Sequence, residues 1–276
     1  MIGLLTDFGT VDSYVGVMKG VIYRIAPDVR IVDITHATQP QNVRQAAFTL
    51  MNSYRYFPTG TIFVVVVDPG VGSERRPVGA MAGGYAFVAP DNGVLSYTLA
   101  ELGEYHAVAL TNSEYQLADT SHTFHGRDIF APAAAHLVAG VPLDAFGETL
   151  DDLMMLPSPM LRVEGKQITG EVVHIDHFGN IVTSIGQMHW VAPERLTLAP
   201  RFGENVATVP IPASETVVYI AGHTILGIQR TYSEVGRGEL LAMIGSNGYL
   251  EIAVNQGNAG AWLDVSIGDE VTVRVG

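Results

Sequence analysis

Asp68, Arg75 and His125 are the residues whose types and positions in this sequence best suit a chemical site. Asp68 follows four consecutive valines, and a turn with one proline and two glycines separates it from Arg75. A guanidinium beside a carboxylate keeps that carboxylate ionised and oriented. His125 precedes an alanine-rich segment, and helix N-termini gather side chains that cap the helix or hold ligands. These residues could form a small-ligand site, although an aspartate that caps a turn and pairs with an arginine would look the same.

Two further aspartates extend this candidate site, because Asp7 follows a short apolar strand and Asp12 lies shortly after it. Asp7, Asp68 and His125 could bind a divalent metal ion, as in a metal-dependent phosphoesterase. Arg75 argues against that interpretation, since a guanidinium next to Asp68 would compete with a cation. We therefore expect no metal site, and activity that survives exhaustive chelation would exclude the phosphoesterase.

Several familiar catalytic classes lack their motifs in this chain. Gly70 and Gly72 do not form a dinucleotide fingerprint, because Arg75 stands where the third glycine belongs. No Walker loop, zincin helix or nucleophile elbow is present. The absence of cysteine excludes disulfides, thiolate nucleophiles and cysteine-bound metals. Covalent catalysis by an activated serine or cysteine therefore has no support.

The composition is that of an acidic, folded protein. Acidic residues outnumber basic ones by 28 to 15, and the net charge of -13 disfavours nucleic acid or an anionic membrane as a partner. Hydrophobic residues make up 47% of the chain, enough for a substantial core. No segment approaches 18 uninterrupted apolar residues, and the first residues show no signal-peptide pattern. We expect a soluble, cytoplasmic protein with no membrane contact.

The first half of the sequence alternates predicted strands and helices, which indicates an α/β domain. The apolar run at residues 61–67 leaves no polar face and is typical of a strand inside a parallel sheet. Because ligands of such sheets bind beyond the carboxyl ends of strands, Asp7 and Asp68 are well placed. The sequence thus predicts an N-terminal α/β domain, residues 1–155, with a mainly parallel central sheet. Its other predicted strands are 2–6, 29–34, a hairpin of 78–81 and 85–88, and 106–110; its predicted helices are 13–25, capped by Asp12 or Ser13, 42–56, 94–102 and 129–138.

The second half of the sequence has a different residue pattern. A boundary is expected between residues 150 and 165, where aspartates and prolines interrupt regular patterns. Beyond it, short β-rich runs are punctuated by glycine, asparagine and proline, with no comparably strong helix. This pattern predicts a small all-β barrel or sandwich as a C-terminal domain, residues 166–276. The predicted strands are 172–175, 181–185, 217–220, 240–244, 250–254 and 271–275.

Two turns of the C-terminal domain could bind polar ligands. Phe178 and Asn180 stand side by side in the segment 174–180; an asparagine amide can offer a purine edge a donor and an acceptor, and a phenylalanine ring can pack on its face. Ser246 and Asn247 lie in a turn before a strand, where hydroxyl and backbone N–H groups could hold a carboxylate. Each segment taken alone would also suit an ordinary hairpin turn.

Five motifs, taken in order, resemble the S-adenosyl-L-methionine hydroxide adenosyltransferase family, also known as domain of unknown function 62. They span essentially the whole chain: residues 6–9 (TDFG), 67–72 (VDPGVG), 124–128 (FHGRD), 176–180 (DHFGN) and 246–250 (SNGYL). The family is related to the fluorinases and chlorinases. The resemblance implies an N-terminal α/β domain joined to a C-terminal β-barrel and assembled as a homotrimer, with sites where neighbouring subunits meet. It therefore also implies an inactive monomer.

This resemblance implies an enzyme that hydrolyses S-adenosyl-L-methionine (SAM) to adenosine and L-methionine, by attack of water or hydroxide on the ribose C5′. SAM is the substrate, and no cofactor is expected because the sulfonium is already a good leaving group. The family's catalytic triad falls on Asp68, Arg75 and His125. We expect Asp68 to orient the water and accept its proton, Arg75 to fix that carboxylate, and His125 to complete the hydrogen-bond network.

The substrate-binding residues also follow from the resemblance. It places Asp7 on the ribose diol and Asp12 on the methionine ammonium, with Ser246 and the backbone near Asn247 on the methionine carboxylate. The adenine contacts are implied to come from Phe178 and Asn180, with Tyr232 stacking on the purine, and Val254 is counted among the substrate-binding residues. One departure is Gln41, where the halogenases carry a tryptophan beside the ribose.

Two alternatives to the hydrolase remain open at this point. A chlorinase-like SAM-dependent halogenase is less favoured, because the halogenases carry a tyrosine at the position of Asp68 and a Tyr-Ser pair at His125-Gly126. Loss of that serine hydroxyl, which helps to hold halide, favours water as the nucleophile. The second alternative is a non-catalytic protein that binds adenosine or SAM, and product formation well above the uncatalysed rate would exclude it.

Overall fold

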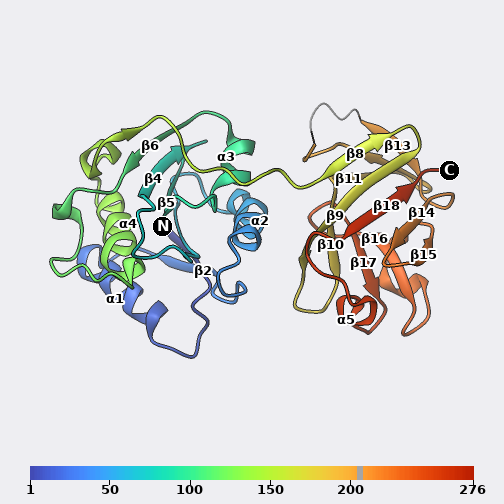
Figure 1. Cartoon of the computed structure of the whole chain (residues 1–276), viewed down its shortest axis with the longest axis horizontal. Coiled ribbons are helices and arrows are strands. Elements are labelled where there is room, and N and C mark those ends of the chain that lie inside the picture. The colour runs from blue at the N-terminus through green and yellow to red at the C-terminus, as the bar shows by residue number, and fades with distance from the viewer. Residues whose placement is uncertain (204–207) are drawn as a thin grey trace. The chain divides into compact units, whose positions relative to one another are not determined.

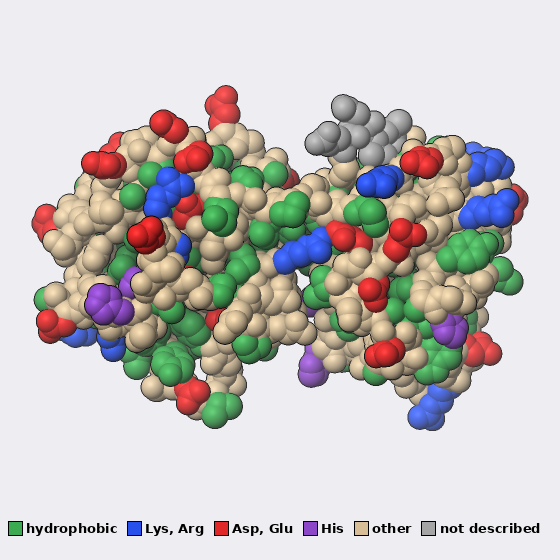
Figure 2. All heavy atoms as spheres, in the orientation of Figure 1, with side chains coloured by type: hydrophobic (Ala, Val, Ile, Leu, Met, Phe, Trp, Pro, Cys, Tyr) green, Lys and Arg blue, Asp and Glu red, His purple; other side chains and the backbone are tan. Residues whose placement is uncertain are grey.

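The computed structural model describes residues 1–203 and 208–276, which divide into two units, Met1–Leu156 and Pro157–Gly276 (Figure 1). Each unit has its own sheet. Acidic side chains are interspersed with basic ones on the face shown in Figure 2. Within the described residues, none of the helices has the length and apolar character needed to cross a membrane.

A seven-stranded sheet organises the first unit, in the order β2-β1-β3-β5-β4-β6-β7. Strands β2, β1, β3 and β5 are parallel, whereas β4 runs antiparallel to β5 and β6, and β6 is antiparallel to β7. The strands are β1 (Ile2–Thr6), β2 (Ile31–Thr35), β3 (Ile62–Val66), β4 (Pro77–Ala82), β5 (Tyr85–Pro90), β6 (Tyr105–Ala109) and β7 (Thr149–Leu150).

The sheet is mixed, so the expectation of a mainly parallel sheet was only partly right. The predicted hairpin is confirmed: Gly83 and Gly84, both with positive φ, turn β4 back onto β5. This reversal puts β4 antiparallel to its neighbours, and β6 then pairs with β4 rather than extending the parallel half. The parallel half contains β1 and β3, the strands that precede Asp7 and Asp68.

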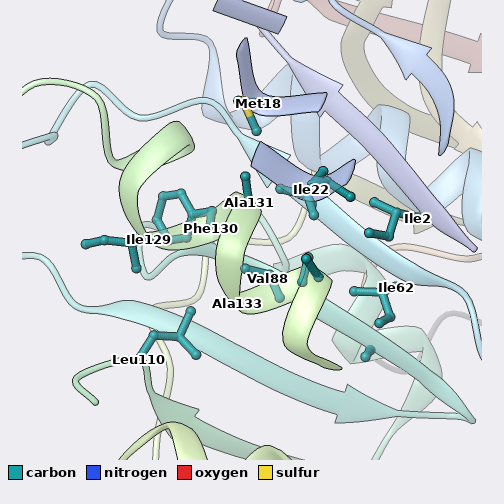
Figure 3. Packing of buried hydrophobic residues seen from close by; sticks show 14 of the residues in the cluster. Ile2, Met18, Ile22, Ile62, Val88, Leu110, Ile129, Phe130, Ala131 and Ala133 are labelled. Carbon is teal, nitrogen blue, oxygen red and sulfur yellow. The ribbon is translucent and has the colours of Figure 1, made fainter. Parts of the chain in front are cut away.

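Helices cover both faces of this sheet (Figure 1). Helices α1 (Tyr14–Ile25) and α4 (Ala131–Val138) share one core cluster with the β1 and β3 side chains of that face, whereas α2 (Val43–Ser53) and α3 (Ser96–Leu102) pack with the opposite face. Figure 3 shows Met18 and Ile22 of α1 beside Ile2, Phe130 and Ala131. Because alternate strand residues point to opposite faces, two buried faces require the continuous apolar strands that the sequence shows.

The ends of two helices differ from the sequence prediction. Ser13 occupies the N-cap of α1 but makes no side-chain capping bond, so neither Asp12 nor Ser13 caps this helix as expected. The helix predicted for residues 42–56 ends earlier, as α2, and continues as a 3₁₀ turn, Tyr54–Tyr56. Asn42 does cap α2, since its side chain accepts a hydrogen bond from Gln45 N at 2.9 Å.

The second unit is a nearly closed, barrel-like antiparallel sheet in the order β15-β14-β18-β9-β10-β17-β16, with β8 added to β9. Gln229, after β15, pairs with Met243 of β16, which brings the two edges together. The strands are β8 (Leu161–Glu164), β9 (Gln167–Ile175), β10 (Ile181–Gly186), β14 (Val217–Ile220), β15 (His223–Leu226), β16 (Leu240–Ile244), β17 (Tyr249–Val254) and β18 (Glu270–Arg274). A small sheet of β11 (Met188–Ala192), β12 (Arg195–Leu198) and β13 (Val209–Pro212) and a short helix α5 (Ala259–Leu263) complete the unit.

Candidate active site

A cavity of about 690 Å³ opens where β1 and β3 end. These strands pair in parallel with Thr6 opposite Val66, so Asp7 and Asp68 emerge at the same edge of the sheet. The cavity is lined by aromatic, apolar and charged side chains from the loops at that edge: Asp7, Phe8, Tyr14, Pro40, Gln41, Val66, Asp68, Pro69, Val71, Ser121, Thr123, Phe124, His125, Gly126 and Arg127. It is large enough for a small organic ligand.

Asp68, Arg75 and His125 meet in this region, as the sequence predicts. Arg75 Nε donates to both carboxylate oxygens of Asp68, each at 3.0 Å, and Arg75 Nη2 donates to Asp68 Oδ2 as well. The same Nη2 lies 2.7 Å from His125 Nδ1. The side chains of Arg75 and Asp68 are only 8% and 5% exposed. The guanidinium therefore joins a buried carboxylate to an imidazole and fixes the orientation of both.

The contact with Arg75 defines the protonation state of His125. A guanidinium can only donate, so Nδ1 must accept and the ring hydrogen of neutral His125 sits on Nε2. Burial, followed by the charge of Arg75, lowers the pKa of His125 below its ordinary value of 6.5, against smaller opposing effects of Asp68, Asp128 and a Ser121 backbone hydrogen bond. His125 is therefore neutral at pH 7, and Arg75 and Ser121 hold its ring.

Asp128 holds the loop that carries His125. Its carboxylate is fully buried and accepts from Ser121 N at 2.8 Å and Ser121 Oγ at 2.7 Å, and it also pairs with Arg127. Burial opposes ionisation, but these hydrogen bonds and the Arg127 charge leave the pKa of Asp128 below its ordinary value. His125 stands at the start of a π-helical turn, Gly126–Phe130, that leads into α4. Neither Arg127 nor Asp128 was singled out from the sequence, although both belong to the FHGRD motif.

Asp7 is held by a backbone group from another loop. Its Oδ2 accepts from Gln41 N at 2.7 Å, and no other described residue contacts its carboxylate through a hydrogen bond, so Oδ1 is left for a ligand. Gln41 adopts the left-handed conformation, with φ of 67°, which is unfavourable for a residue with a Cβ. Strain of this kind is often retained at functional sites. No side-chain pattern could have revealed this contact, because the donor is a main-chain N–H.

We expect Gln41→Gly to keep or raise stability by about 1 kcal/mol, because glycine adopts this conformation freely and retains the N–H that binds Asp7. Gln41→Val should instead lower stability by roughly 1–2 kcal/mol, since a β-branched residue tolerates positive φ poorly. Thermal and denaturant unfolding of both variants would test this. A Gln41→Gly protein clearly less stable than wild type would show that the side chain, not the backbone, secures this loop.

Asp12 does not join this group within the first unit. It lies exposed in the loop before α1 and is not among the residues that line the cavity. Its neighbour Val11 is 96% exposed, so this part of the loop makes little contact with its own unit.

The second unit brings together Asn180 and Tyr232. Asn180 Nδ2 donates to Asp176 Oδ2 at 2.9 Å and to Tyr232 Oη at 3.3 Å. Both amide hydrogens are thus used internally, so Asn180 can offer a purine only its Oδ1 acceptor, rather than the donor and acceptor expected from the sequence. Phe178 is 74% exposed and leaves its ring open to a ligand. Ser246 and Asn247 are exposed in the turn between β16 and β17, whereas Val254 is buried at the end of β17.

Metal ligands do not gather in the described residues: no three histidine or acidic side chains within 1–203 and 208–276 converge suitably on one point. In the cavity, the Asp68 carboxylate faces the Arg75 guanidinium instead. The donor set here is therefore that of an ion-paired carboxylate and a neutral histidine.

Comparison with family models identifies both units. Residues 2–147 match the SAM hydroxide adenosyltransferase N-terminal domain, and residues 170–272 match the C-terminal domain of the same family. Together the two models cover most of the chain.

Curated relatives extend over nearly the full length. The chain is 37% identical to an (R)-S-adenosyl-L-methionine hydrolase of Salinispora tropica, covering 100% of this chain and 98% of the relative, and 37% identical to one of Thermus thermophilus, covering 92% of each. A fluorinase of Actinopolyspora mzabensis is 29% identical, with 92% of this chain and 90% of the relative covered. A crystal structure of an uncharacterized conserved protein from Thermotoga maritima matches with a TM-score of 0.85 and 37% identity, over 99% of this chain and 100% of the other.

Proposed function

Because the chain belongs to the SAM hydroxide adenosyltransferase family, we propose that it is an enzyme that hydrolyses S-adenosyl-L-methionine to adenosine and L-methionine. The observation that carries this proposal is the Asp68–Arg75–His125 group, with its buried carboxylate and guanidinium, at a cavity that Asp7 also lines. The relatives named as hydrolases are more similar to the chain than the fluorinases are. Incubation of the protein with SAM, followed by chromatography of the products, tests the proposal.

The reaction makes its main demand on the nucleophile. As water oxygen bonds to C5′, the C5′–S bond breaks and its electron pair passes to sulfur, so the positive charge of the sulfonium disappears. The departing methionine thioether is neutral and needs no proton. What the protein must supply is a water molecule aligned opposite sulfur, and alignment alone can be worth several kcal/mol. An acid that assists the leaving group is therefore not required.

We propose that Asp68 holds this water and accepts its proton. A carboxylate is a weak base, but water becomes strongly acidic as its oxygen bonds to carbon, so a weak base suffices late in the step. Arg75 fixes the carboxylate with a two-pronged contact, and His125 Nδ1 accepts from the same Nη2 that contacts Asp68. The proton leaves with the solvent once adenosine has its 5′-hydroxyl, and Asp68 returns to its ionised form.

We expect the hydrolysis rate to fall at acidic pH as His125 becomes protonated. Imidazolium cannot accept from Arg75 Nη2 and adds a second positive charge beside it, so the network is intact above the pKa of His125 and lost below it. Since that pKa is lowered, the fall should centre below pH 6.5.

The pH profile of kcat/KM for wild type and His125→Gln would test this, because a glutamine oxygen can also accept from Arg75 but does not titrate. The acid limb due to His125 should disappear in His125→Gln. An acid limb that stays unchanged in the variant would contradict the assignment.

The substrate contacts are proposed residue by residue. Asp7 Oδ1, which keeps no partner among the described residues, would accept from the ribose diol, and Asp12 would pair with the methionine ammonium. Phe178, Asn180 and Tyr232 would contact adenine, while Ser246 and the backbone near Asn247 and Val254 would complete the contacts of the second unit. The cytoplasmic location stays a prediction from the sequence.

We also propose that the active form is a homotrimer in which second-unit residues complete the substrate contacts. A monomeric form should then be inactive, because each site would take its Asp68 and its Asn180 from neighbouring subunits. Sedimentation combined with activity measurements over a range of protein concentrations would test this. A fully active monomer would contradict the trimer proposal while leaving the chemistry at Asp68 untouched.

A further inference from the structure

One face of the second-unit sheet carries an acidic side chain, Glu251, that has no part in the proposed hydrolysis step. Val182 of β10 pairs with Glu251 of β17, and directly paired residues of antiparallel strands project to the same face. Asn180 lies in the turn just before β10, and its two hydrogen-bond partners, Asp176 and Tyr232, are also the groups that interact electrostatically with Glu251. Glu251 therefore shares a surface with Asn180, the side chain proposed to contact adenine.

The hydrogen-bond inventory of Asn180 leaves one atom for a ligand. Asp176 holds the turn by accepting from Phe178 N at 2.8 Å, Asn180 N at 2.9 Å and Asn180 Nδ2 at 2.9 Å. A carboxylate only accepts, which fixes the amide with Nδ2 toward Asp176. The residue is 7% exposed, and its Oδ1 has no partner within residues 1–203 and 208–276. Adenine could give this oxygen an N6 hydrogen, but a ring nitrogen beside N6 would still need a donor.

Glu251 is placed to be that donor. Its carboxyl lies against the backbone of Gly245, where a Cβ would overlap Oε1. No described residue donates a hydrogen bond to it, and no described Lys or Arg pairs with it. The groups that face it electrostatically are Asp176 and Tyr232. Burial, followed by the charge of Asp176, raises the pKa of Glu251 to about 7, and the charge of Glu251 helps to raise the pKa of Tyr232.

We propose that Glu251, as a carboxylic acid, is a specificity residue for adenine: its O–H donates to a ring nitrogen while Asn180 Oδ1 accepts from the exocyclic amine. The inference rests on the proposed function, which places adenine here. Adenine presents an N–H donor next to a ring acceptor, whereas hypoxanthine presents an oxygen next to a ring N–H. The pair Glu251–Asn180 complements the first pattern and opposes the second, so inosine should bind about 10²-fold more weakly than adenosine.

Calorimetric binding of adenosine and inosine to the full-length protein between pH 5.5 and 8.5 tests this. Because adenosine would bind the protonated form, its affinity should be constant below about pH 7 and fall up to tenfold per pH unit above it. Glu251→Gln should keep the affinity within a few-fold and lose this pH dependence, since its amide donates but does not titrate. Glu251→Ala should bind at least tenfold more weakly at pH 6, again without the pH dependence. Glu270→Gln, an exposed glutamate of β18, is the matched control and should behave as wild type.

Gly245→Ala provides an independent test, because the residue lacks positive φ and the three atoms nearest to the added methyl all belong to the Glu251 carboxyl group. Gly245→Ala should weaken adenosine binding as Glu251→Ala does, and the double variant should bind adenosine no more weakly than Glu251→Ala alone. Any of three outcomes would overturn the inference. Glu251→Gln could keep the pH dependence, Glu251→Ala could bind adenosine like wild type, or inosine and adenosine could bind with equal affinity. Failure of this inference can be told apart from failure of the proposed function, because SAM hydrolysis by the same wild-type preparation is measured in a separate assay.

Discussion

Asp68→Asn should lower kcat for SAM hydrolysis by roughly 10²- to 10⁴-fold, the range that a general base contributes. Asparagine has the shape of aspartate and can still accept from Arg75 through Oδ1, but it cannot take the proton that water must lose. Adenosine affinity should stay within a few-fold of wild type, because Asp68 acts on the water and not on the nucleoside. Steady-state kinetics and calorimetry with adenosine, on the same preparation, separate the two effects.

A matched control for this variant is Asp91→Asn. Asp91 is also a nearly buried carboxylate paired with an arginine, Arg76, whose Nε donates to it at 2.8 Å, but it does not line the cavity. Its loss should reduce stability without a specific loss of kcat. If Asp68→Asn lowers kcat by less than tenfold while its adenosine affinity is unchanged, the assignment of Asp68 as the base is contradicted.

Arg75→Met is expected to destabilise the first unit by about 3–5 kcal/mol, the usual cost of leaving one partner of a buried ion pair alone. The Asp68 side chain is only 5% exposed, so its charge would lose its partner and be left with little more than the water of the cavity. The melting temperature should fall by roughly 10 °C, and hydrolysis should be lost as well. Denaturant unfolding and activity assays measure both effects.

The double variant Asp68→Asn with Arg75→Met separates the stability effect from the catalytic one. With no buried charge left, much of the lost stability should return, while activity should remain at the level of Asp68→Asn. An Arg75→Met protein as stable as wild type would show that Asp68 is solvated or protonated in the folded state, and the ion pair would then not hold the site.

The triad could be predicted from the sequence because its members lie in short local motifs at strand and helix ends. Asp68 and Arg75 are separated only by a turn, and His125 sits at the start of a helical segment. The strand before Asp68 could also be predicted from the sequence, since a strand buried on both faces must be apolar throughout. These features follow from local chemistry, which a sequence displays directly.

Other features required knowledge of pairing between distant segments. The contact between Asp7 and Gln41 uses a backbone N–H and a left-handed residue that no motif marks. The role of Glu251 depends on its pairing with Val182, which lies 69 residues earlier in the chain. The two residues meet only because β10 pairs with β17. The prediction of a mainly parallel sheet was right only for β2, β1, β3 and β5, because the β4–β5 hairpin was expected but its effect on the pairing of β6 was not.

Product analysis after chelator-treated protein is incubated with SAM, with and without added chloride, decides whether water is the nucleophile. We expect adenosine and methionine at a rate unaffected by chloride, since we propose that the Asp68–Arg75–His125 group holds water. 5′-Chloro-5′-deoxyadenosine would instead assign the chain to the halogenases. The absence of turnover, with adenosine bound to the purified protein, would contradict the proposed enzymatic activity. It would indicate a protein that binds adenosine without catalysis.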